Sequence, residues 1–69
     1  MKISARNRLE GKIVEVKKGA TTAHVRLAVG GTIVTASITN EAVDELGLKV
    51  GDTAYAIVKA SDVMIGLDD

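Results

Sequence analysis

Two short segments of the sequence each combine a hydroxyl with a cation at a spacing of two residues. Ser4 precedes Arg6 in the first, and Lys59 precedes Ser61 in the second. An extended chain projects residues i and i+2 to the same side, so each pair presents its hydroxyl and charge together. Two such pairs facing each other form a pocket of donors and positive charge without a carboxylate, which suits a multivalent oxyanion. Solvated residues of an exposed strand have the same spacing, so both interpretations stay open.

A third source of hydrogen-bond donors is the start of a predicted helix. The segment Asn40–Gly47 has the signals of a short helix, with Thr39 or Asn40 as its N-terminal cap and Gly47 as its left-handed C-terminal stop. The first backbone N–H groups of a helix have no partner within the helix. The segment Thr39–Ala42 is therefore a candidate part of the same site.

A predicted β-hairpin is the clearest of the elements that must position these segments. Residues 23–29 alternate apolar side chains with mostly polar ones, and residues 32–39 alternate in the same way. Gly30 and Gly31 lie between them, and glycine supplies the positive φ that a primed turn requires. This pattern predicts two antiparallel strands joined by a two-residue turn.

Three further strands complete the predicted fold. The segment Arg8–Lys18 changes the parity of its apolar residues at Ile13 and Val14, which predicts a bulge or a strong bend. Strands are also expected over Thr53–Ala60 and Val63–Gly66. The order β-β-β-α-β-β indicates an all-β protein with one short helix, folded as a five-stranded small barrel of the oligonucleotide/oligosaccharide-binding (OB) type.

The composition excludes several classes of protein. The chain has 69 residues, no cysteine and one histidine, which excludes disulfides and thiolate metal sites and argues against zinc. Nine basic residues balance nine acidic ones and Tyr55 is the only aromatic residue, so a nucleic-acid surface is not expected. No segment is typical of a signal peptide or membrane span, and no catalytic triad is evident, so we expect a cytoplasmic, non-enzymatic protein. Because a domain this short buries little surface, we expect it to oligomerise.

Short motifs follow one another along nearly the whole chain: Ser4-Ala5-Arg6-Asn7, Leu9-x-Gly11, Val16-Lys17-Lys18-Gly19, Ile38-Thr39, Leu46-Gly47-Leu48 and Lys59-Ala60-Ser61-Asp62-Val63-Met64-Ile65. Their content and order resemble the molbindin (Mop) domain, a small molybdate-binding module. The resemblance implies that residues 1–69 form a single Mop-type domain, often with an N-terminal strand exchanged between subunits. It also implies a hexamer, built as a trimer of dimers, that binds molybdate and tungstate at its subunit interfaces.

The resemblance also assigns roles to individual residues of a first oxyanion site. Ser4, Arg6 and Lys59 match the positions that contact the ligand most directly. Backbone amides or hydroxyls contribute at four further positions, which here are Ala5, Thr39, Ala60 and Ser61. Some relatives have a serine where this chain has Ala42, so one side-chain donor is either missing here or replaced by a backbone amide.

Hexameric members of the family have a second anion site near the three-fold axis. By position, this site falls on Lys18 and the turn Gly19-Ala20-Thr21-Thr22. An ordinary glycine- and threonine-containing turn explains the same residues equally well, so both interpretations stand.

Resemblance and donor chemistry together predict an intracellular oxyanion-binding protein that serves in molybdenum storage, buffering or homeostasis. Molybdate is a dianion whose oxygens only accept hydrogen bonds, so its site needs donors, with no covalent cofactor and no side chain ligating the metal directly. Protonated phosphate would set its hydroxyl against other donors at a cost of about 1–3 kcal/mol. Sulfate has to be excluded by cavity size. The alternatives are a nucleic-acid-binding OB-fold protein and a purely structural oligomerisation module.

Overall fold

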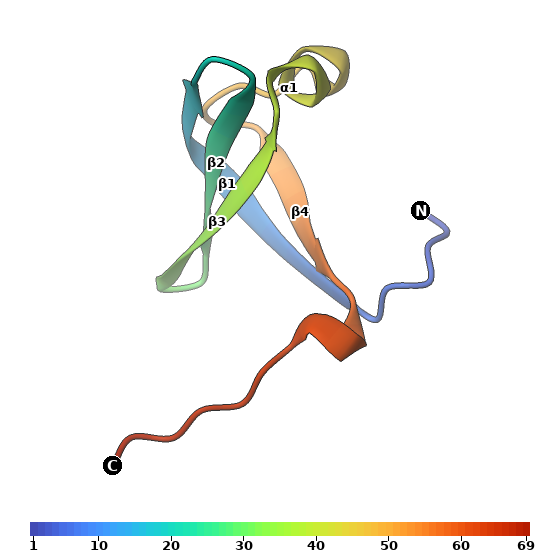
Figure 1. The fold of residues 1–69 in the computed structure, drawn as a ribbon, viewed down its shortest axis with the longest axis vertical. Helices are drawn as coiled ribbons and strands as arrows, with labels where there is room; N and C mark the ends of the chain where they lie inside the picture. The colour runs from blue at the N-terminus through green and yellow to red at the C-terminus, as the bar shows by residue number, and fades with distance from the viewer.

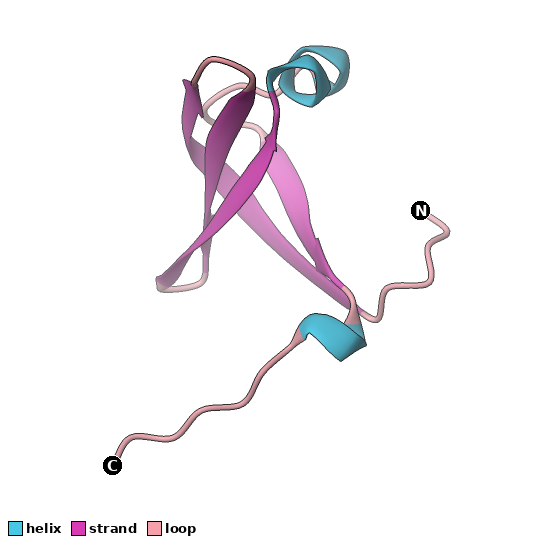
Figure 2. Cartoon of the chain, in the orientation of Figure 1, coloured by secondary structure: helices cyan, strands magenta, loops and turns pink.

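The computed structural model describes residues 1–69 and contains one antiparallel sheet with a short helix at one end (Figure 1, Figure 2). Helix α1 (Asn40–Leu46) connects the third strand to the fourth, and a single 3₁₀ turn, η1 (Ala60–Asp62), follows the fourth strand. The spatial order of the strands is β3-β2-β1-β4. They are β1 (Asn7–Lys18), β2 (Thr22–Val29), β3 (Thr32–Thr39) and β4 (Thr53–Val58). The prediction of a mostly β protein with one short helix is confirmed.

The hairpin of β2 and β3 forms at the predicted residues. Val29 pairs with Thr32 across a two-residue turn, and Gly30 has a φ of 60° there. Alternation places Ala23, Val25 and Leu27 in the core and leaves the side chains between them exposed. The hairpin therefore presents one apolar face to the rest of the protein.

The predicted bulge lies in β1 at Val14. Ile13 pairs with Leu27 and Glu15 pairs with Arg26, so Val14 has no pairing partner on β2. The extra residue turns Val14 outward, where it is 44% exposed, and keeps Ile13 fully buried. The N-terminal half of β1 pairs with β4 and its C-terminal half with β2, so this bent strand connects the two sides of the sheet.

The caps of α1 are those predicted from the sequence. Thr39 Oγ1 accepts a hydrogen bond from the backbone N–H of Ala42 at 3.0 Å, and Gly47 ends the helix with a φ of 63°. Val43 is the buried residue of the helix, and it packs against the core residues of the sheet. The core itself is small, with five buried residues, namely Ile13, Ala23, Val25, Leu27 and Val43.

The fifth strand predicted over Val63–Gly66 is absent from the single chain, and the sheet is not closed into a barrel. After β4 the turn η1 directs the chain away from the sheet, and the residues that follow extend from the body as a tail (Figure 1). A strand forms only where its backbone groups find a partner strand, and no edge of the sheet is beside this tail. Met64, Ile65 and Leu67 are 91%, 89% and 93% exposed.

The single chain does not show an N-terminal strand exchanged between subunits, since β1 is an inner strand paired with β2 on one side and β4 on the other. The segments that pair with nothing lie before β1 and after η1. None of the helices has the length and apolar character needed to cross a membrane.

Candidate functional site

The fold brings the two hydroxyl–cation segments to the same end of the sheet. The ladder between β1 and β4 ends at the pair Asn7 and Val58, and the Nδ2 of Asn7 donates to the carbonyl oxygen of Val58 at 3.1 Å. Ser4–Arg6 directly precedes this pair on one strand, and Lys59–Ser61 directly follows it on the other. Two segments that are distant in the sequence therefore leave the sheet from the same end.

The cations at this end have no carboxylate partner. The ion pairs of the structure join Lys18 to Asp44 and Arg26 to Glu15, so neither Arg6 nor Lys59 takes part in one. Both side chains are exposed, as are the hydroxyl-bearing Ser4 and Ser61. This end of the sheet thus gathers donors and positive charge, which is the arrangement that a multivalent oxyanion requires.

Thr39 lies far from these segments within the same chain. It pairs with Thr22 and caps α1, at the end of the sheet where β1 finishes at Lys18 (Figure 1). The 12 residues of β1 separate the two ends, a length of about 36 Å at the usual rise of a strand. The hydroxyl of Thr39 accepts from the N–H of Ala42, so its own proton is free to be donated. One chain cannot bring Thr39 to the anion that Arg6 and Lys59 would hold.

The predicted second site is a tight turn in which three of the four carbonyl groups, those of Gly19, Thr21 and Thr22, accept hydrogen bonds. The N–H of Gly19 donates to the carbonyl of Thr22 at 2.7 Å. Asn40 donates twice, from its backbone N–H to the carbonyl of Thr21 and from its Nδ2 to that of Gly19, both at 2.9 Å. These three acceptors are therefore directed toward the protein, which reduces the repulsion that an anion bound outside the turn would meet.

Two residues beside this turn were not singled out from the sequence. Lys17 and His24 pair across β1 and β2, and their side chains line a shallow pocket of about 270 Å³ together with Lys18, Gly19 and Thr22. Lys17 stands in one of the quoted motifs but was given no role, and His24 lies outside all of them, although alternation places both on the outer face. The register between the two strands, which the sequence does not state, brings them together.

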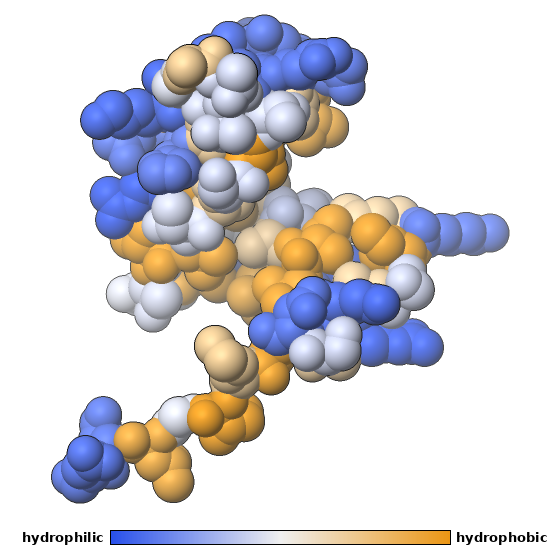
Figure 3. Space-filling model, in the orientation of Figure 1, coloured by the Kyte–Doolittle hydropathy of each residue, from blue (hydrophilic) through white to orange (hydrophobic).

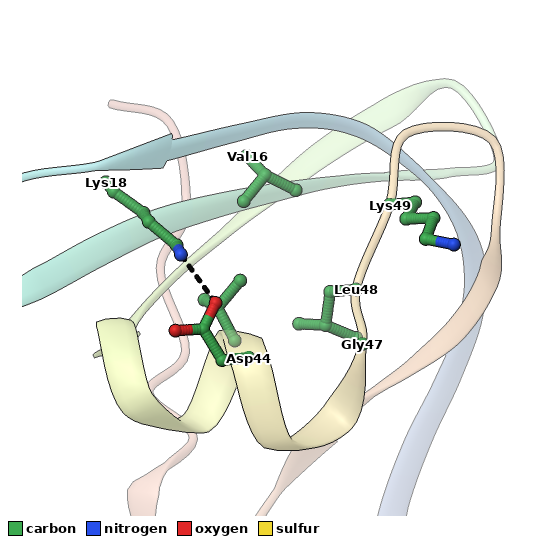
Figure 4. A pocket seen from close by; sticks show the side chains of 7 residues that line it. Val16, Lys18, Asp44, Gly47, Leu48 and Lys49 are labelled. Carbon is green, nitrogen blue, oxygen red and sulfur yellow. Dashed lines mark hydrogen bonds and ion pairs between the residues drawn. The ribbon is translucent and has the colours of Figure 1, made fainter.

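Lys18 also faces a second, open pocket of about 510 Å³ between α1 and β1 (Figure 4). Its Nζ is 2.5 Å from Oδ1 of Asp44, an ion pair that the figure draws as a dashed line. This carboxylate competes with any anion for Lys18. The remaining residues of the pocket are Val16, Val43, Gly47, Leu48 and Lys49.

An apolar groove of about 520 Å³ runs between β3 and β4, the two edge strands of the open sheet. In Figure 3 hydrophobic surface gathers over the lower part of the molecule and along the tail, while the end that carries α1 is mostly hydrophilic. Of the 15 residues that line the groove, 14 are hydrophobic, and nine come from the two edge strands. No group of three or more His, Cys, Asp or Glu side chains is placed to hold a metal ion.

The profile of the TOBE domain matches residues 3–65. The chain belongs to the TOBE domain family. This TOBE domain is 52% identical over 66 residues to "Molybdenum-pterin-binding protein 2" of Clostridium pasteurianum, covering 94% of this chain and 97% of the relative. It also resembles two solved structures. One is a molybdate-binding protein from Sporomusa ovata, with a TM-score of 0.93, 39% identity and coverage of 97% and 100% of the two chains.

The other is ModG, described as a cytoplasmic molybdate-binding protein and solved with molybdate bound. The TM-score is 0.92 and the identity 46%, and the match covers 99% of this TOBE domain and 49% of the ModG chain. The likeness extends over almost the whole of this chain in every case. The Mop-type resemblance noted from the motif order is thereby confirmed.

Proposed function

We propose that this TOBE domain is a binding protein, not an enzyme, that holds molybdate or tungstate in the cytoplasm for molybdenum storage, buffering or homeostasis. Residues 1–69 act as one domain. The observation that carries the proposal is the meeting of two hydroxyl–cation segments, free of carboxylate partners, at the end of the β1–β4 ladder. Relatives named for molybdenum or molybdate, similar over nearly the full length of the chain, support this choice of anion.

The first site takes its charge from Arg6 and Lys59. Two cations balance the charge of a tetrahedral dianion, and hydrogen bonds to charged groups are about twice as strong as neutral ones. The hydroxyls of Ser4 and Ser61, with the backbone N–H groups of Ala5 and Ala60, supply the remaining donors. Every oxygen of the ligand is an acceptor, so this donor set discriminates against protonated phosphate.

A second copy of the chain completes the fold. The edges of β3 and β4 are unpaired, the groove between them is apolar, and Val63–Leu67 is an apolar segment without a partner. We therefore place the tail of one copy between β3 and β4 of the other, where it forms the fifth strand and closes an OB-type barrel. Such reciprocal exchange builds a dimer, and three dimers form the hexamer.

The same exchange brings Thr39 to the anion. A tail that runs antiparallel to β3 of the second copy begins beside the last residue of that strand, which is Thr39. Lys59–Ser61 immediately precedes the tail, so it lies next to Thr39 of the second copy. The first site is then shared between subunits, which accounts for the separation of its residues within one chain.

The second anion site comprises Lys18 and the turn Gly19-Ala20-Thr21-Thr22, and it lies toward the three-fold axis of the hexamer. The engaged carbonyls of the turn and the nearby side chains of Lys17 and His24 support it. Three copies of this basic pocket around one axis would surround an anion with positive charge. The ion pair between Lys18 and Asp44 makes this the weaker of the two sites.

Calorimetric titration with molybdate, tungstate, sulfate and phosphate tests the proposed function. We expect heat with molybdate and tungstate and much less with the other anions. Arg6→Ala and Lys59→Ala should each weaken molybdate binding far more than Lys12→Ala or Lys49→Ala, which remove equal charge elsewhere. No heat with molybdate, or equal heat with sulfate, would contradict the proposal, and a hexamer that binds none of the anions would indicate a structural module.

A further inference from the structure

The side chain of Asn7 makes the last cross-strand contact before the proposed anion site. Its Nδ2 donates to the carbonyl oxygen of Val58, 51 positions away in the sequence, and this hydrogen bond is partly buried. Asn7 and Val58 are also the final backbone pair of the β1–β4 ladder. Beyond this pair the two chains separate, one toward the N-terminus and the other into η1 (Figure 1).

No other hydrogen bond fixes the two segments of the site relative to each other. The backbone bonds outside helices and strands include Asp62 N–H to Lys59 and Val63 N–H to Ala60, both within the second segment. None of the backbone or side-chain bonds outside the strands involves a residue before Asn7. The position of Ser4–Arg6 relative to Lys59 therefore depends on the end of the ladder.

Electrostatic repulsion acts against this arrangement when the anion is absent. Arg6 and Lys59 are the residues immediately outside the Asn7–Val58 pair, both are positively charged, and neither has a carboxylate partner. Like charges at neighbouring cross-strand positions destabilise the pairing. The ends of ladders open most easily, so the two cations would separate if nothing held them.

We propose that Asn7 is the positioning residue of the anion site, and that its bond to Val58 holds Arg6 and Lys59 together before the ligand arrives. This inference rests on the proposed function. Apparent affinity falls in proportion to the fraction of protein in the binding-competent arrangement. Asn7 raises that fraction without touching the anion, because its carboxamide faces the neighbouring strand.

Calorimetry with molybdate on the full chain measures the effect. Asn7→Ala should weaken binding about 2- to 13-fold, the range expected for one net hydrogen bond. Asn7→Gln retains a carboxamide donor and should recover part of the affinity. Asp52→Ala is the control, because Asp52 Oδ2 accepts a hydrogen bond from the backbone N–H of Lys49 outside both segments, and its loss should leave the affinity of the first site close to that of the unmodified protein.

A double-mutant cycle separates positioning from a general effect on stability. With Lys59→Ala in place there is no like-charge pair to restrain, so adding Asn7→Ala should change molybdate affinity by less than twofold. Equal losses in both backgrounds would overturn the inference, as would unchanged affinity in Asn7→Ala alone. If Asn7→Ala fails to fold, Asn7→Ser provides the same cycle. Absence of molybdate binding by the unmodified chain would instead refute the proposed function.

Discussion

Replacing Ile65 with aspartate tests whether the tail supplies the fifth strand of a partner. Ile65 is 89% exposed in the single chain and lies in the middle of the apolar segment that follows η1. In the exchanged dimer its side chain would enter the groove between β3 and β4, where 14 of 15 lining residues are hydrophobic. The substitution removes that burial and places a charge in the same position.

The expected effect follows from burial and symmetry. Full burial of an isoleucine side chain contributes about 1.5–3 kcal/mol. A two-fold exchange buries two such side chains, so their loss costs the dimer about 3–6 kcal/mol. This corresponds to a dissociation constant raised roughly 100- to 20 000-fold, and the desolvation of the carboxylate adds to it.

Sedimentation equilibrium over a range of protein concentrations measures the change directly. Tyr55, the only aromatic residue, lines the groove from β4 and reports its coverage through fluorescence. Met64→Asp is the matched control. Successive side chains of a strand face opposite sides, so the apolar Val63, Ile65 and Leu67 would share the side that enters the groove, and Met64 would lie on the other side. Met64→Asp should therefore dissociate the assembly much less than Ile65→Asp.

Two results would refute this reasoning. If Ile65→Asp assembles as the unmodified chain does, the tail does not occupy the groove of a partner. If Met64→Asp and Ile65→Asp dissociate the assembly equally, the tail makes an apolar contact without the alternation of a strand. Either result would leave the barrel open and require another route for Thr39 to reach the anion.

Three further predictions concern single positions. A Cβ at Gly11 would lie 2.5 Å from the carbonyl oxygen of Ala28, so Gly11→Ala should lower the free energy of unfolding by about 1–3 kcal/mol in urea denaturation. Thr39→Val should cost about 0.5–2 kcal/mol of stability by removing the helix cap and should also weaken molybdate binding, and Thr39→Ser should restore both. Asp44→Asn releases Lys18 from an exposed ion pair, so the free energy of unfolding from thermal denaturation should change by less than about 1 kcal/mol. Calorimetric titration of the same variant should show tighter anion binding at the second site.

Local elements were predictable because their signals act through neighbouring residues. Gly30 has the positive φ of the hairpin turn, and Thr39 and Gly47 cap α1 as their side chains or conformations require. The change of apolar parity at Val14 marks the bulge because alternation reports which face of a strand is buried. Each of these features depends on a few consecutive residues.

The last strand was predicted less well for the same reason. The segment Val63–Gly66 has the apolar character of a strand, and β-forming residues favour such a conformation. An apolar segment becomes a strand only when a second strand lies beside it. Here η1 directs the segment away from the open edges of β3 and β4. Pairing of this segment depends on where a second edge lies in space.

The candidate site divides in a similar way between sequence and structure. The sequence by itself determined the chemical types, namely two hydroxyl–cation pairs with no carboxylate between their members, because spacing in an extended chain sets which side chains share a side. Only the tertiary structure decided that Arg6 and Lys59 flank the same cross-strand pair and that Thr39 lies at the far end of the sheet. The physical reason is that the register between strands distant in the sequence decides which residues lie side by side. Strand pairing in the folded chain sets this register, and the local sequence does not.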